Sequence, residues 1–247
     1  MAERTQPTRL QVFAHYLDPF SLRVLYALAF KYVNFELVEV NLANKSDEFL
    51  EVNPKGETPA VRYWVGSTVH TLSGSKEIVN WVADTFPGPP LYPLALDMTE
   101  DAEVRAKLVE RMQVVETVAS HYFLFMRGEP ADNVYAEMRD ALRLLNDKYL
   151  AGGRPFAHEL VGYENRVSVG DILLLPFIER LDANRTLMHG KEVLAQDLGN
   201  VWAWLHRMNT QGWYAQYKQL PRYFQKVAEY HRSVPGGKLT LPVTIYH

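Results

Sequence analysis

The residues between Asn53 and Val61 have the types needed to present main-chain groups to a ligand. The run Asn-Pro-Lys-Gly-Glu-Thr-Pro-Ala-Val contains two prolines and a glycine, so neither a helix nor a central strand can pass through it. A run of strand composition, Ala60–Val65, follows directly. A proline at such a loop-to-strand junction is a candidate for a cis peptide bond, which would turn the N–H and C=O of Thr58 outward to pair with another backbone. An ordinary turn with a trans proline is the alternative.

Seven elements are expected around this segment, in the order βαβαββα. Alternating patterns with β-branched or aromatic residues predict the strands, and apolar residues at helical spacing predict the helices. The expected strands are Leu10–Tyr16, Phe35–Leu42, Ala60–Val65 and Val69–Leu72, and the expected helices are Ser21–Tyr32, a short helix capped by Ser46, and Ser73–Phe86. This order predicts an α+β unit with a mixed sheet over residues 1–86.

The chain changes character after residue 86. Residues 87–93 are rich in proline and glycine, which is typical of a linker between domains. Three long runs beyond the linker have helical period, namely Glu100–Phe125, Val134–Leu150 and Val193–Met208. We therefore predict an all-helical C-terminal domain over residues 94–247. Its tail, Leu239–His247, is interpreted as an extended arm or as an added edge strand.

The composition is that of a globular protein, with 47% hydrophobic and 22% charged residues in 247. A net charge of -3 argues against a nucleic-acid-binding surface. The absence of cysteine excludes disulfides, thiolate metal sites and a cysteine nucleophile, and the eight histidines lack metal-binding spacing, so we predict no metal. No apolar run approaches the roughly 20 residues that span a bilayer, and residues 1–9 lack an apolar signal segment. We expect a cytoplasmic protein without a membrane or nucleic-acid partner.

The order of these elements and motifs resembles the cytosolic glutathione transferase superfamily. The segment from Asn53 to Val61 is similar to the family's NPxGxxPxL-type segment, in which the proline is cis and the residue before it pairs with the cysteinyl backbone of glutathione. The spacing Ser75-x-x-Ile78-x-x-Trp81 is similar to the opening of the family's next helix, and Ser168–Leu181 resembles its buried helix with a capping box. The resemblance implies a thioredoxin-like N-terminal domain, glutathione as co-substrate and a homodimer.

The resemblance also implies which residues bind glutathione. The segment Asn44-Lys45-Ser46 is similar to one in the omega and tau classes, where the lysine approaches the glycine carboxylate. Thr58 and Pro59 would hold the cysteinyl backbone, and Ser75 would hold the γ-glutamyl carboxylate. A serine in the first turn of a helix suits this role because its hydroxyl and the free amides there bind anions. A solvated surface lysine and a plain N-cap serine are the alternative interpretations.

Asp18 departs from the pattern at the position where omega and tau transferases have a catalytic cysteine or serine. An ionised carboxylate at ~4 Å would oppose thiolate formation by about 4 kcal/mol at an effective dielectric near 20. Thiol transfer through a cysteine of the protein is excluded, because the sequence contains no cysteine. Thiolate conjugation then requires another donor to the sulfur, for which Tyr16 and Ser21 are the local candidates. A protonated Asp18 is a further candidate, which requires a strongly raised pKa.

Gly74 is the second departure, because the family usually has an acidic residue beside the serine. The missing acid removes a contact to the α-amino group of the γ-glutamyl moiety, and a hydrogen bond to a charged group contributes about 1.5–3 kcal/mol. We therefore expect glutathione to bind weakly. Neither departure is expected to disturb the fold.

Three functions are compatible with these residues. The first is an atypical glutathione transferase with an apolar electrophile or ligand in the cleft between domains, lined in part by the aromatic run His121–Met126. The second is a catalytically inactive, transferase-like binding or scaffold protein, and the third is a carrier of apolar ligands. Asp18 and Gly74 favour the second and third, whereas Lys45, Thr58 and Ser75 favour glutathione binding.

Overall fold

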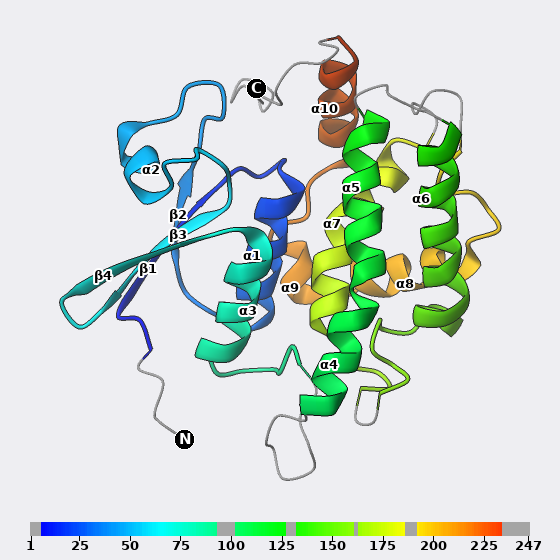
Figure 1. The fold of residues 1–247 in the computed structure, drawn as a ribbon, viewed down its shortest axis with the longest axis horizontal. Helices are drawn as coiled ribbons and strands as arrows, with labels where there is room; N and C mark the ends of the chain where they lie inside the picture. The colour runs from blue at the N-terminus through cyan, green and yellow to red at the C-terminus, as the bar shows by residue number, and fades with distance from the viewer. Residues whose placement is uncertain (1–5, 93–101, 127–131, 161–162, 186–191, 234–247) are drawn as a thin grey trace.

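The protein forms a small α+β unit followed by a group of helices in a computed structural model (Figure 1). The structure describes residues 6–92, 102–126, 132–160, 163–185 and 192–233. The predicted tail, Leu239–His247, lies outside these residues. None of the described helices is long and apolar enough to cross a bilayer.

The N-terminal sheet has the strand order β2-β1-β3-β4. Strand β1 pairs in parallel with β2 and antiparallel with β3, which in turn pairs antiparallel with β4. The mixed sheet and the order βαβαββα are therefore confirmed. The strands are β1 (Arg9–Ala14), β2 (Glu36–Glu39), β3 (Ala60–Val65) and β4 (Thr68–Ser73), and the helices are α1 (Pro19–Phe30), α2 (Asp47–Val52) and α3 (Ser75–Thr85).

Alternation along β1 places apolar residues on both faces of the sheet. Val12 belongs to the main core, on the face that α1 and α3 cover, whereas Phe13 packs on the opposite face against Phe49 of α2 with ring centroids 6.0 Å apart. Both faces of β1 are therefore covered, and its end at Ala14 leads directly to the turn before α1.

The described residues of the C-terminal part form helices joined by turns and loops, with no strand among them. It contains α4 (Ala102–Arg111), α5 (Gln113–Met126), α6 (Asp132–Leu144), a π-helix (Leu145–Tyr149), a short 3-10 helix (Ala151–Gly153), α7 (Val169–Ala183), α8 (Gly199–Asn209), α9 (Gly212–Ala215) and α10 (Pro221–Ser233). The prediction of one helix over Glu100–Phe125 is wrong, because Met112 separates α4 from α5. Helix α8 begins at Gly199, not at Val193, because residues 192–198 form turns in which Leu198 N donates to Ala195 O at 3.2 Å.

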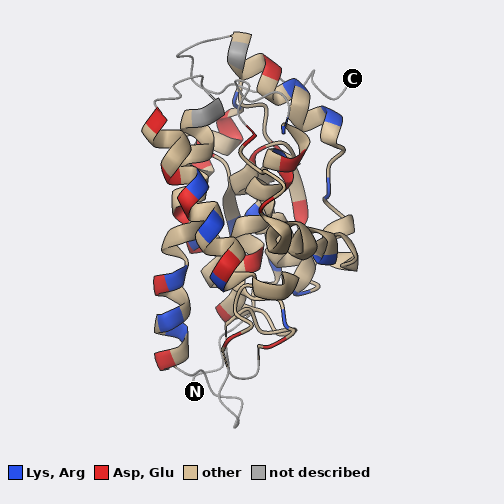
Figure 2. Cartoon of the chain, turned by 90° about the vertical axis from the view of Figure 1, so that its right-hand side faces the viewer, with Lys and Arg blue, Asp and Glu red and all other residues tan. Residues whose placement is uncertain are grey.

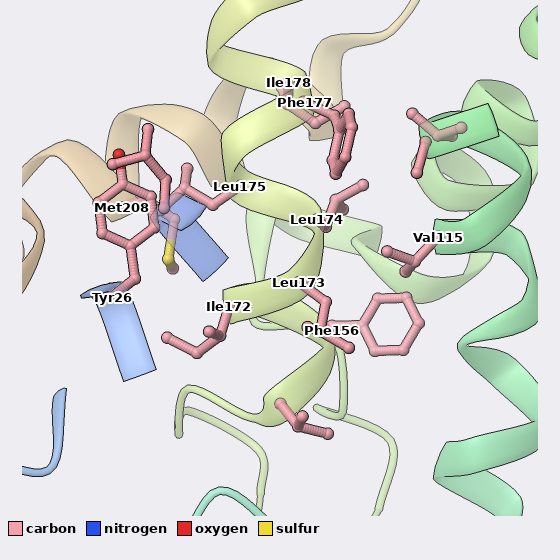
Figure 3. Close-up of a cluster of buried hydrophobic side chains, with 14 of the residues drawn as sticks. Tyr26, Val115, Phe156, Ile172, Leu173, Leu174, Leu175, Phe177, Ile178 and Met208 are labelled. Carbon is pink, nitrogen blue, oxygen red and sulfur yellow. The ribbon is translucent and has the colours of Figure 1, made fainter. Parts of the chain in front are cut away.

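Helix α7 is the centre of the main core. Every residue from Val169 to Leu181 is buried, and most of them are apolar, as expected of a helix that the core surrounds. Figure 3 shows Ile172 and Leu175 on the side of Tyr26 from α1, and Leu174 on the side of Val115 from α5. The two parts of the chain therefore share one core around α7.

Acidic and basic residues are interspersed along the helices in the view of Figure 2. Several of them form ion pairs along or between helices, including Lys107 with Glu103 and Arg143 with Asp140.

Candidate functional site

Asp18 is the N-cap of α1 and points into the protein. Its Oδ1 accepts a hydrogen bond from Phe20 N at 3.1 Å, and its Oδ2 accepts from Ser21 N at 3.0 Å and from Ser21 Oγ at 2.6 Å. The extended backbone of Asp18 and Pro19 at the first helical position are typical of a helix start. A carboxylate is favourable there because the helix dipole places partial positive charge at this end.

Thr58 connects the loop before β3 to Asp18. Its Oγ1 donates to Asp18 Oδ2 at 2.9 Å, and the bond between Thr58 and Pro59 is cis, as predicted. Within the described residues, the main-chain N–H and C=O of Thr58 have no hydrogen-bond partner, and the residue is half-buried. These groups are therefore available to pair with an extended peptide.

Asp18 thus receives four hydrogen bonds while being only 9% exposed. Burial raises the pKa of its carboxyl group, and the bonds from Ser21, Thr58 and Phe20 act in the opposite direction. Two backbone amides and two hydroxyls are the kind of donors that stabilise an anionic sulfur. At this site the carboxylate of Asp18 already occupies them.

Ser21 and Tyr16, the predicted alternative donors, lie in different surroundings. Ser21 is fully buried, and its hydroxyl donates to Asp18 and accepts from His15 N at 3.1 Å. Its single O–H is therefore already used. Tyr16 is half-buried, and burial followed by the charge of Glu39 raises the pKa of its hydroxyl. Of the two, only Tyr16 remains accessible to solvent.

Lys45 lies across the loop that carries Thr58. Gly56 has a φ of +66°, and a Cβ at this position would meet Lys45 Nζ at 3.1 Å. The exposed ammonium group therefore lies against the backbone two residues before Thr58. Gly56 allows this close approach because it has no side chain.

Ser75 lies next to the residue that is hydrogen-bonded to Pro59 at the end of the same loop. It is the first residue of α3 and is 7% exposed, and the N-cap before it, Gly74, donates its N–H to Pro59 O at 3.3 Å. No side chain caps the first amides of α3. The structure therefore brings Lys45, Thr58 and Ser75 around one loop, with Asp18 beside it.

Two further residues position the turn that carries Asp18, and the sequence did not indicate either of them. His15 Nδ1 accepts from Leu17 N at 3.1 Å, and Arg180 of α7 donates to Leu17 O at 2.9 Å. Burial, followed by the charge of Arg180, lowers the pKa of His15 to about 4, so its imidazole is neutral at neutral pH. Arg180 is 163 positions away from Leu17 in sequence, which is why no local pattern could reveal the contact.

Aromatic side chains from three helices pack together at the start of α1. Phe20 stacks on Phe123 of α5 with ring centroids 5.5 Å apart, and both rings are half-buried. Phe177 of α7 meets both rings edge-on. The two half-buried rings offer an apolar surface next to the start of α1.

A separate cleft of about 720 Å³ lies between the two parts of the chain. Its lining comes from α3, α4 and α5 together with Tyr92 and Met112. Asp18, Thr58 and Phe20 do not line it. His121, a residue of the predicted aromatic run, makes local contacts on α5 and α6, to Thr117 O and to Glu137 Oε2, each at 2.7 Å. The described residues contain no cluster of side chains suited to hold a metal ion.

The chain is similar in sequence to known glutathione S-transferases. Residues 19–85 match the family model described as "Glutathione S-transferase, N-terminal domain". A probable glutathione S-transferase, GSTU1, of Oryza sativa subsp. japonica is 30% identical over 187 residues, which cover 72% of this chain and 74% of the relative. Glutathione S-transferase omega-1 of Rattus norvegicus is 23% identical over 175 residues, covering 71% and 68% of the two chains.

Solved structures agree with the fold. A rice glutathione transferase, OsGSTU1, in complex with glutathione superposes with a TM-score of 0.74 at 25% identity, covering 90% of this chain and 94% of that chain. Glutathione transferase Omega 1C from Trametes versicolor gives a TM-score of 0.72 at 19% identity, covering 92% and 98%, and shows the fold alone. These relatives favour a transferase-like protein over a scaffold. The chain belongs to the cytosolic glutathione S-transferase superfamily.

Proposed function

We propose that this protein binds glutathione around the loop of residues 53–59. In this arrangement the main chain of Thr58 pairs with the cysteinyl backbone, as a strand pairs with an extended peptide. Lys45 pairs with the glycine carboxylate, and Ser75 with the first amides of α3 binds the γ-glutamyl carboxylate. The proposal depends on one observation, the meeting of these three residues at a single loop beside Pro59.

The second ligand is proposed to be an apolar molecule held against Phe20 and Phe123. These rings are half-buried and lie at the start of α1, where the sulfur of the bound tripeptide would also lie. Stacked aromatic surfaces bind planar apolar groups favourably. A small aromatic electrophile fits this description.

Asp18 determines the state of the bound thiol in this proposal. The carboxylate uses the two amides and two hydroxyls that would otherwise donate to a thiolate, and it adds a negative charge nearby. Glutathione is therefore bound as the neutral thiol, and conjugation by the wild-type protein is slow. Tyr16 is the remaining candidate donor to the sulfur.

The test is a calorimetric titration with glutathione, followed by a conjugation assay with a generic aromatic electrophile. We expect the wild type to bind glutathione, and we expect Asp18→Ser to conjugate at least about tenfold faster, because one pKa unit of the thiol is a tenfold change in thiolate at neutral pH. Asp140→Ser, at an exposed position of α6, is the matched control and should behave as wild type. A wild type that does not bind glutathione contradicts the proposal.

The proposal also includes a homodimer and a cytoplasmic location. Both are expectations from the superfamily. Light scattering of the purified chain and fractionation of cells that express it test these two points separately from glutathione binding.

A further inference from the structure

Arg23 of α1 carries a guanidinium group that is buried between the two parts of the chain. The residue is fully buried, its Nε donates to Leu173 O of α7 at 2.9 Å, and its Nη2 lies 3.2 Å from Glu116 Oε1 of α5. The group therefore connects three helices. An arginine in a protein stays protonated at neutral pH, so a positive charge is held at this point.

The guanidinium group lies against the aromatic side chains at the start of α1. Arg23 follows Phe20 by three residues, so the two side chains are neighbours on one face of the helix. The guanidinium carbon lies 5.2 Å from the centre of the Phe20 ring and 4.8 Å from that of Phe177. Aromatic rings attract a cation at such distances, most strongly where both are removed from water. Arg23 is fully buried, so it contacts the Phe20 ring without reaching a ligand that lies on this ring.

A contribution to stability does not account for this arginine. Within the described residues, neither Arg23 Nη2 nor Glu116 Oε1 forms a hydrogen bond, although both atoms are buried. Their contact is therefore an attraction between charges without an aligned hydrogen bond. Buried polar atoms are normally hydrogen-bonded, and apolar residues of similar volume often replace buried ion pairs without loss of stability. The feature that an apolar residue could not reproduce is the charge against the Phe20 ring.

Glu116 extends this arrangement to the separate cleft between the two parts of the chain. Its side chain is 34% exposed and lines that cleft, whereas Phe20 does not line it. The carboxylate is therefore both accessible to solvent and in contact with the buried guanidinium group. A change at Glu116 would reach the Phe20 ring through Arg23.

We propose that Arg23 is a positioning residue for the apolar ligand. It holds the Phe20 ring in the orientation that receives this ligand against Phe123, and Glu116 in turn holds the guanidinium group. A ring that is fixed before binding reduces the cost of ordering it in the complex, so the ligand binds more tightly. The inference rests on the proposed function, and it assigns a role to two residues that touch neither ligand.

The test compares glutathione with S-benzylglutathione, whose ring is attached to the sulfur and would reach Phe20. Both are titrated calorimetrically into the wild type, Arg23→Met, Glu116→Gln and the control Arg143→Met, which removes a charge from an exposed position of α6. We expect the wild type and the control to prefer S-benzylglutathione by at least about tenfold, because its ring buries apolar surface. Arg23→Met should reduce this preference about fivefold and Glu116→Gln about twofold, with the affinity for glutathione itself unchanged.

The double variant Arg23→Met/Glu116→Gln tests whether Glu116 acts through Arg23. If it does, the double variant has the same preference as Arg23→Met, because the second change has nothing left to act on. A preference that falls further in the double variant would show that Glu116 influences the ligand by another route, and it would overturn the inference.

The remaining outcomes separate this inference from the function on which it rests. An Arg23→Met variant that keeps the wild-type preference, or that loses affinity for both ligands alike, overturns the positioning role. An unchanged preference in Glu116→Gln also overturns it, and this variant decides the matter if Arg23→Met does not fold. A wild type that binds glutathione without preferring S-benzylglutathione overturns the proposed apolar surface and the inference with it, and a wild type that binds neither ligand overturns the proposed function.

Discussion

His15 gives the turn before Asp18 a dependence on pH. The folded protein protonates this buried imidazole only below about pH 4, whereas an exposed histidine takes up its proton near 6.5. Between these values the unfolded chain binds more protons, so the contribution of His15 to stability is present above about 6.5 and is lost as the pH falls toward 4. The shift corresponds to about 3 kcal/mol. Protonation would also remove the acceptor that holds Leu17 N.

Urea unfolding of the wild type and of His15→Asn, at pH 7 and near pH 4, measures this contribution. The stability advantage of the wild type over the variant should shrink by about 3 kcal/mol on acidification. The wild type and the variant must be compared at the same pH, because other buried groups also titrate. Burial raises the pKa of Asp18, Asp171 and Glu179, so protonation of these groups stabilises the fold in both proteins. An advantage that does not change with pH would contradict the prediction.

The sequence indicated which residues could take part in the site but not what each of them contacts. Asp18 could be placed at the cysteine or serine position of the family because the motif around it is local. Its bond to Thr58 joins residues 40 positions apart, so no spacing rule could reveal that the carboxylate also anchors the loop before β3.

At the scale of single elements, the start of α7 depends on Asp171. Its carboxylate accepts from Ser168 N and Ser168 Oγ at 2.8 Å each, which confirms the predicted capping box. It also accepts from Phe156 N at 2.8 Å and from Trp204 Nε1 at 2.7 Å, two contacts that the sequence did not predict. The cap therefore also joins α8 and the segment before α7 to this helix.

Asp171→Ala should destabilise the protein by at least about 3 kcal/mol. The change removes the cap, which contributes about 1 kcal/mol, and leaves several buried donors without a partner, at about 1–3 kcal/mol each. Asp140→Ala, on the exposed face of α6, is the control and should change stability by no more than about 0.5 kcal/mol. Urea denaturation compares the two variants, and equal, small effects would show that the capping contacts contribute little.

Elements with local start signals were predicted better than those without them. Ser46 caps α2 as predicted, α1 begins at Pro19 just before the expected Ser21, and the alternating strands occur where they were expected. The break at Met112 was missed because the apolar period continues from α4 into α5. Helix α8 was predicted to begin too early for a similar reason, since Val193 and Leu194 are buried in turns rather than in a helix.

At the scale of the whole molecule, buried polar contacts join α1 to α7. Glu179 accepts from Tyr26 at 3.1 Å, from Tyr214 at 2.7 Å and from Arg180 at 3.0 Å, and Arg180 also donates to Leu17 O. The predicted division at residues 87–93 separates these elements in sequence, yet they share one core. We therefore expect the chain to unfold as one cooperative unit.

Arg180→Leu should destabilise the protein by about 3–5 kcal/mol, because it leaves the carboxylate of Glu179 buried without its cationic partner. It should also weaken glutathione binding, since Leu17 O loses the contact that fixes the turn before Asp18. Arg143→Leu, at an exposed position of α6, is the control. Tryptophan fluorescence and circular dichroism, followed during unfolding, give the free energy of unfolding of both variants. An Arg180→Leu variant as stable as Arg143→Leu would contradict the prediction.

The ionisation of bound glutathione directly tests whether Asp18 occupies the hydrogen-bond donors that would otherwise stabilise the thiolate. A pH titration of the ultraviolet absorbance of the thiolate, on the wild type saturated with glutathione and on Asp18→Ser, gives the pKa of the bound thiol. We expect the wild type to leave this pKa at or above that of free glutathione, and Asp18→Ser to lower it by at least about one unit. A wild type that itself lowers the pKa of the bound thiol would show that Asp18 does not occupy the donors of the sulfur.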